Sequence, residues 1–76
     1  MKVFQIIASK NNSSNIFAMR VDKNTIEADV FGKFASYRSM NSFLKAAGYK
    51  IISIYDDLGN NVTNYIEKEI EDVFRS

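Results

Sequence analysis

The sequence predicts one small α+β domain over residues 1–76, with its elements in the order β-β-β-α-β-α. Two observations support this prediction. Apolar and β-branched residues form strand-like segments within residues 2–31 and again over residues 49–55. Over residues 34–47 and 62–74 the apolar positions recur at three- and four-residue steps, which is typical of helices with one buried side. We therefore expect a largely antiparallel sheet of three or four strands packed with two helices.

Three strands are expected in the first part of the chain. Residues 2–8 are rich in β-branched and aromatic side chains, and residues 16–22 resume this pattern. Between them, the Asn- and Ser-rich residues 9–15 favour a mobile loop. After a tight-turn candidate at residues 22–25, Ile26, Ala28 and Val30 alternate with polar residues, which predicts a half-buried strand over residues 25–31. The short connections favour an antiparallel meander.

The rest of the chain predicts a helix, a strand and a second helix. The first helix is expected from about residue 34, with Ser36 or Ser39 as its N-cap, and Gly48 suits its C-terminus because that position favours a positive φ. Residues 49–55 form the fourth strand and residues 56–61 a loop. Asn61 or Thr63 could cap the last helix. The sequence leaves open whether the two helices share one face of the sheet.

Composition narrows the class of protein. The chain has no Cys or His, no signal-peptide-like apolar run and no stretch long enough for a membrane span, so we expect a cytoplasmic protein. Its abundance of residues with A/T-rich codons favours a phage or mobile-element origin. The net charge of +1 hides an asymmetry: residues 1–55 carry eight Lys/Arg against three Asp/Glu (+5), and residues 56–76 carry two against six (−4).

Enzymatic function is not expected, because imidazole and thiol groups are both absent. The adjacent Asp56 and Asp57 are interpreted as a solvated turn. A helix-preceding calcium loop starting at Asp56 fails, because Leu58 and Asn61 occupy its third and sixth positions. The three glycines are too far apart for a phosphate-binding loop. We therefore expect no cofactor and no metal site.

The favoured hypothesis is a small regulatory or accessory protein that binds or inhibits a partner protein through its surface. One candidate contact is an acidic face of the last helix, made by Glu67, Glu71 and Asp72. The other is a basic face of the first helix, for a phosphate or an acidic protein, made by Lys33, Arg38 and Lys45. A sheet edge could also pair with a second copy of the chain and form a homodimer.

The alternative hypothesis is binding of single-stranded nucleic acid or RNA. Eight basic residues within positions 1–55 could neutralise phosphates. Aromatic residues on the expected strands could stack unpaired bases, namely Phe4, Phe17, Tyr49 and Tyr55. However, the basic residues are scattered along the sequence, the last helix is acidic, and Phe4 and Phe17 suit a core. We therefore expect a protein partner in preference to a nucleic acid.

Overall fold

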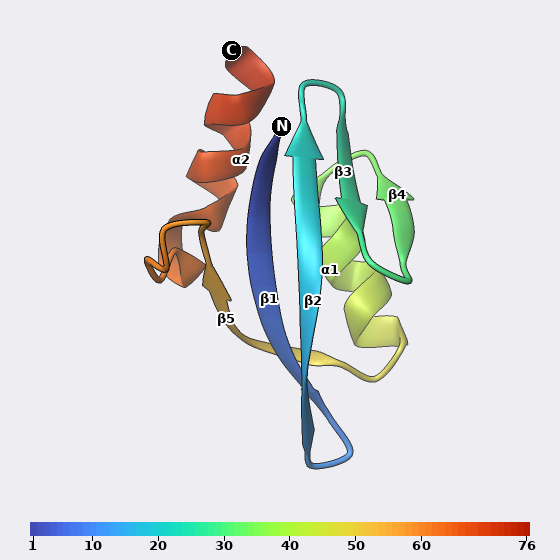
Figure 1. Cartoon of the computed structure of the whole chain (residues 1–76). Coiled ribbons are helices and arrows are strands. Elements are labelled where there is room, and N and C mark those ends of the chain that lie inside the picture. Colours follow the sequence, from blue (N-terminus) through green and yellow to red (C-terminus); the bar gives the residue numbers. More distant parts are fainter.

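The computed structural model covers all 76 residues and consists of one antiparallel sheet and two helices (Figure 1). The strands are β1 (Lys2–Lys10), β2 (Ser13–Asp22), β3 (Thr25–Ala28), β4 (Gly32–Phe34) and β5 (Lys50–Tyr55). The helices are α1 (Tyr37–Ala46) and α2 (Ile66–Arg75), and a 3₁₀ turn (Thr63–Tyr65) leads into α2. The strand order is β4-β3-β2-β1-β5. The α+β class is confirmed, but the sheet has five strands instead of the three or four expected.

The additional strand is β4, in a segment between the predicted strand over residues 25–31 and the first helix, which was expected from about residue 34. Its Phe34 pairs with Ile26 of β3, and Gly32 pairs with Ala28. β3 ends at Ala28, short of the predicted residue 31, because Val30 adopts a φ of 61° and Gly32 a φ of 90°, which reverse the chain. A strand of three residues is too short to show an alternating pattern, and Phe34 fits the helical period equally well.

The β1–β2 hairpin is longer than the sequence predicted. The two strands pair as far as Lys10 and Ser13, so Asn11 and Asn12 alone form the turn. Both have positive φ, 51° and 64°, which suits a two-residue type I′ turn and which Asn tolerates better than most residues. The predicted loop over residues 9–15 is therefore wrong except at its centre. Its polar composition reflects exposure to solvent and not a lack of strand pairing.

The helix ends confirm one predicted cap and correct another. Ser36 is the N-cap of α1: its Oγ accepts the Ser39 N–H at 3.1 Å, and the Ser39 Oγ accepts the Ser36 N–H at 3.2 Å, which makes a reciprocal capping box. The helix therefore begins at Tyr37 and not at residue 34. At the other helix, neither Asn61 nor Thr63 is the cap. The Thr63 Oγ1 instead accepts the N–H of Ile54 at 2.8 Å and ties the turn to β5.

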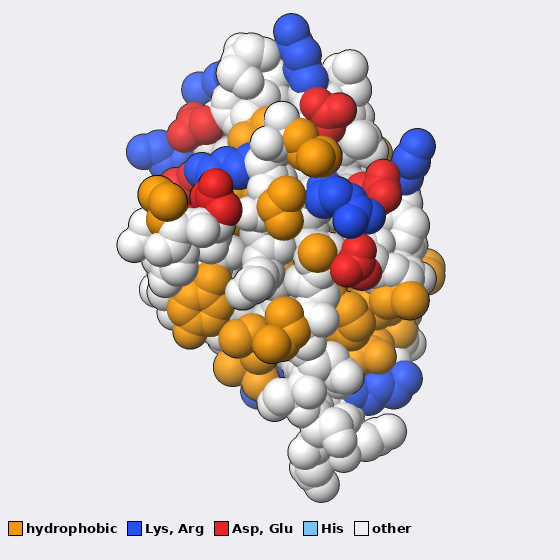
Figure 2. Space-filling model, viewed as in Figure 1, with side chains coloured by type: hydrophobic (Ala, Val, Ile, Leu, Met, Phe, Trp, Pro, Cys, Tyr) orange, Lys and Arg blue, Asp and Glu red, His pale blue; other side chains and the backbone are white.

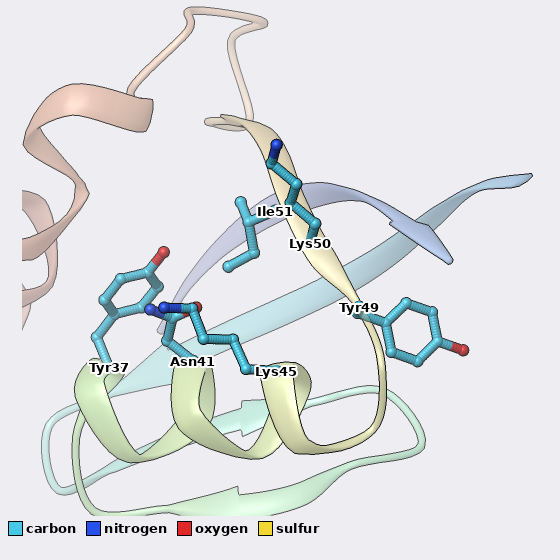
Figure 3. Close-up of a pocket in the computed structure, with 6 residues that line it drawn as sticks. All are labelled: Tyr37, Asn41, Lys45, Tyr49, Lys50 and Ile51. Atoms are coloured by element: carbon cyan, nitrogen blue, oxygen red, sulfur yellow. The ribbon is translucent and has the colours of Figure 1, made fainter. Parts of the chain in front are cut away.

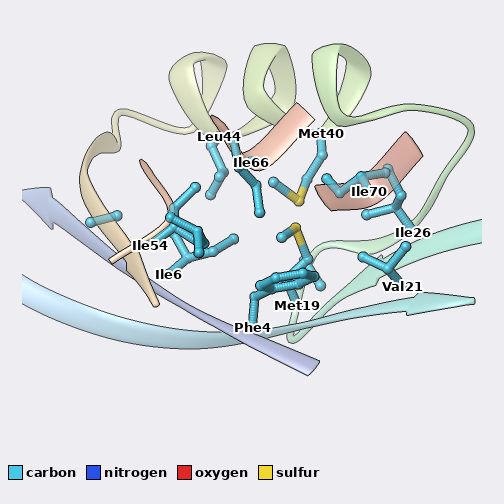
Figure 4. Packing of buried hydrophobic residues seen from close by; sticks show 13 residues of the cluster. Phe4, Ile6, Met19, Val21, Ile26, Met40, Leu44, Ile54, Ile66 and Ile70 are labelled. Carbon is cyan, nitrogen blue, oxygen red and sulfur yellow. The ribbon is translucent and has the colours of Figure 1, made fainter. Parts of the chain in front are cut away.

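Both helices pack on the same face of the sheet (Figure 4). The core consists of 13 buried residues, all hydrophobic, contributed by the sheet, both helices and Val62, which precedes the 3₁₀ turn. They include Phe4 and Ile6 of β1, Met40 and Leu44 of α1, and Ile70 of α2. No polar or charged residue is buried. Neither helix has the length and hydropathy needed to cross a membrane. No helix covers the opposite face of the sheet, although the loop with Asp56, Asp57 and Gly59 borders it at Val3 and Gln5.

Candidate binding surface

The uncovered side of the sheet is formed by the residues that alternate with the core positions. Across the strands, Val3 lies beside Arg20, Gln5 lies between Ala18 and Tyr55, and Ile7 lies between Ile16 and Ser53. Glu27 and Lys33 continue the row of Arg20 onto β3 and β4. We call this surface the open sheet face. In Figure 1, β1 and β2 lie in front of α1, so the viewer looks onto this face, and Figure 2 shows the same view with all side chains.

The open sheet face exposes apolar side chains that do not contribute to the core. Ile16 is 67% exposed and Val3 38% exposed. Ile16 pairs directly with Ile7, so two β-branched side chains stand next to each other on this side of the sheet. Hydrophobic side chains gather in two groups in the lower half of the view, below most of the charged ones (Figure 2). A gathering of exposed apolar groups on one face of a small domain is typical of an interaction surface.

An ion-pair cluster lies on the same face. The Arg20 guanidinium is 2.8 Å from a carboxylate oxygen of Glu27 and 3.2 Å from one of Asp29. The hydrogen bond to Glu27 is the main cause of a raised pKa for Arg20. The Asp29 carboxylate also accepts the N–H of Ala18 at 3.3 Å. The only guanidinium of this face is therefore already engaged by two acidic neighbours.

The residues of the predicted acidic face, Glu67, Glu71 and Asp72, are all on α2, but basic side chains lie next to two of them. Glu67 and Glu71 line a cleft of about 290 Å³ between α1 and α2, and Arg38 lines the same cleft. Glu71 is also ion-paired with Arg75, and the neighbouring Glu69 is bound to Lys2 at 2.8 Å. Asp72 is exposed and does not line this cleft. The acidic residues of α2 are therefore distributed among basic neighbours.

The predicted basic helix face is also divided. Lys33 is on β4, opposite Glu27, so its assignment to the first helix is wrong. Arg38 and Lys45 are both in α1, but Arg38 lines the cleft that contains Glu67 and Glu71, whereas Lys45 lines a different one. Lys33 is in β4 because the helix begins only after Ser36. Arg38 and Lys45 are in the first and last turns of α1, so they line different clefts.

Lys45 belongs to a cleft between α1 and β5, which sequence reasoning did not identify. It has a volume of about 470 Å³ and is lined by Tyr37, Asn41, Lys45, Tyr49, Lys50 and Ile51 (Figure 3). The burial of Tyr37 is the main cause of its raised pKa, and the negative charge of Glu67 adds to it, so its hydroxyl keeps its proton. A sequence signal for this basic region existed: no Asp or Glu occurs between Asp29 and Asp56.

Asp56 holds the turn between β5 and the 3₁₀ turn, as the solvated-turn interpretation expected. Its carboxylate accepts the backbone N–H groups of Asn60 at 2.8 Å and of Leu58 at 3.0 Å. These hydrogen bonds, that from the Asn60 backbone first, lower the pKa of Asp56. No group of three or more His, Cys, Asp and Glu side chains is arranged to hold a metal ion.

The aromatic residues considered for base stacking do not share one face. Phe4 is fully buried, and Phe17 packs edge-on against Phe31 and Tyr49, with ring centroids 5.1 and 5.3 Å away. Tyr55 lies on the open sheet face.

Comparison with known proteins gives no match to this chain among family models, curated proteins or solved structures. Functional proposals therefore rest on the geometry and charge of the surfaces described above.

Proposed function

We propose that the protein is a small, non-enzymatic binding module that recognises a partner protein through its open sheet face. The observation that supports this most strongly is the placement of both helices on one side of the sheet, which leaves Ile16 and Val3 exposed on the other. Burying such side chains against a partner would release roughly 25 cal/mol for each Å² of apolar surface. A domain that binds in this way acts as a regulator or inhibitor by occupying part of its partner's surface.

The charges of the open sheet face favour a protein over a nucleic acid as the ligand of this face. Arg20 and Lys33 carry two positive charges, which Glu27 and Asp29 offset. A face with no excess positive charge gives little attraction for a phosphate backbone. Protein–protein interfaces, in contrast, typically combine apolar side chains at the centre with polar and charged side chains at the rim.

The sheet edges offer less for binding than the face does. At one edge, β4 has only three residues. At the other, residues 61–63 cover the end of β5: Tyr55 bridges to Asn61, and Val62 donates its N–H to the Ile54 carbonyl at 2.8 Å. Short or covered edges hinder strand addition. Homodimer formation through an edge is therefore a weaker proposal than contact through the face.

The test is selective capture. The purified protein is immobilised and exposed to a lysate of its source cells, and any captured protein is then purified and titrated by calorimetry. We expect Ile16→Lys to abolish binding, because it places a charge among apolar contacts. The matched control is the triple variant Glu67→Gln, Glu71→Gln, Asp72→Asn, which changes the helical side and should leave the affinity unchanged. Loss of binding in the triple variant, with Ile16→Lys unaffected, would move the interface to α2 and refute the proposal.

A further inference from the structure

We propose that the cleft between α1 and β5, together with the adjacent Lys10, binds the phosphate groups of a single-stranded nucleic acid. We call this surface the basic cleft; its charged and polar groups are those of Lys10, Asn41, Lys45, Tyr49 and Lys50. Lys50 lies opposite Ser9, at the border of the open sheet face, but the basic cleft includes neither Val3 nor Ile16, so this proposal stands independently of the proposed protein partner.

Three separate elements bring the lysines of the basic cleft together. Lys45 comes from the last turn of α1, Lys50 from the start of β5, and Lys10 from the end of β1. In Figure 3 the Lys45 side chain runs along α1 toward Asn41, and Lys50 occupies the opposite wall on β5. Lys45 and Lys50 thus come from different walls of the cleft, and the Lys50 side chain runs along β5 away from α1 (Figure 3).

The position of Lys10 is fixed by the residues that link α1 to β5. Its ammonium group lies 5.0 Å from the centre of the Tyr49 ring, within cation–π range. Its side chain passes close to Gly48, where an added Cβ would lie 3.4 Å from the Lys10 Cε. Gly48 has a φ of 90°, so a residue other than glycine would be strained there as well. The Lys10 ammonium group is therefore held at Tyr49 and Gly48, in the link that follows Lys45 and precedes Lys50.

No acidic side chain is ion-paired with these lysines. None of the three lysines takes part in an ion pair, whereas Lys2, Arg20 and Arg75 all do. No residue that lines the cleft is acidic. Clustered charge of one sign in a hollow concentrates its field and attracts ligands of the opposite sign. The basic cleft differs in this respect from the open sheet face, where each sign balances the other.

A nucleic-acid chain fits this surface better than a single phosphate ion. The positive charges of the basic cleft are spread over three elements, which suits the repeated phosphates of a chain better than one ion. An aromatic ring lines the cleft itself: that of Tyr49, which is half-buried and has the Lys10 ammonium group 5.0 Å from its centre. Unpaired bases stack on such rings while lysines neutralise the backbone.

The test measures binding of a fluorescein-labelled oligothymidine, about 12 nucleotides long, by anisotropy at several salt concentrations. Three phosphate contacts predict a slope of about −2 for log K against log salt. Lys45→Gln and Lys50→Gln should each weaken binding roughly tenfold at about 50 mM salt and reduce the slope by about 0.7. The matched control is Lys23→Gln, which removes the same charge from the β2–β3 turn and should leave both values unchanged.

Three results would overturn the proposal. One is a slope near zero for the wild type, and the second is a loss in Lys23→Gln equal to that in Lys45→Gln. The third is competition by inorganic phosphate as effective as that by unlabelled oligonucleotide at equal phosphate concentration, which would indicate a site for the free ion. Tyr49→Leu should weaken oligonucleotide binding, and an unchanged affinity would refute the stacking contact. Circular dichroism establishes that each variant is folded.

Discussion

The two faces of the sheet carry similar residues in very different surroundings. Ile6 and Ile16 belong to the paired strands β1 and β2, yet Ile6 is fully buried and Ile16 is 67% exposed. The difference arises because both helices pack on the side that Ile6 faces. The covered face therefore explains why the chain folds, whereas the apolar residues of the open sheet face contribute little to folding and are available for recognition.

The largest predicted effect contrasts these two isoleucines. Ile6→Ala should lower the free energy of unfolding by about 2–5 kcal/mol, because it leaves a cavity in the core. Ile16→Ala should change it by less than about 0.5 kcal/mol, because solvent already surrounds most of the side chain. Urea unfolding followed by circular dichroism measures both. Equal losses in the two variants would mean that the open sheet face is part of the folding core, contrary to our account.

A smaller effect is expected at Val30, in the turn between β3 and β4. Val30 is 88% exposed and has a φ of 61°, a conformation that β-branched residues rarely adopt. Val30→Asn should raise the free energy of unfolding by about 1 kcal/mol, because Asn tolerates this conformation and no buried contact is lost. Thermal unfolding measures the change. A destabilised variant would show that the valine side chain makes a packing contact that the fold requires.

The smallest effect concerns the turn held by Asp56. Its hydrogen bonds to Asn60 and Leu58 lower its pKa from the ordinary value of 3.8. Because the folded-state pKa is the lower one, the carboxylate contributes its stability fully above the unfolded-state value and loses it as the pH falls through the folded-state value. Asp56→Ala should therefore be less stable than wild type at neutral pH, and the difference should shrink below about pH 4. A difference that is constant from about pH 7 to pH 2 would contradict this.

The sequence predicted the covered face better than either binding surface. The alternation identified Ile26 and Ala28 as core residues, and the helical spacing identified Met40 and Leu44, because burial leaves a periodic signal. Val30, predicted on the same face as Ile26, is instead 88% exposed, because the chain turns after Ala28. Short elements left no such signal, so β4 was missed and Lys33 was placed on a helix. The open sheet face could not be recognised without knowing that the helices share one side.

The basic cleft shows a similar limit. Lys45 and Lys50 lie on either side of Gly48 in the sequence, which indicates that they are near each other. Lys10 is distant in the sequence and joins them only because β5 pairs with β1, where Ser9 lies opposite Lys50. Strand order is a long-range property that the spacing of residues along one chain does not determine.

Site-specific photo-crosslinking in the source cells tests the central claim most directly. A benzophenone amino acid is introduced either at Ile16, on the open sheet face, or at Asp72, which is exposed on α2. Our account predicts a discrete protein adduct from position 16 and none from position 72. An adduct from position 72 alone, or from neither position under conditions in which the partner is captured, would contradict it.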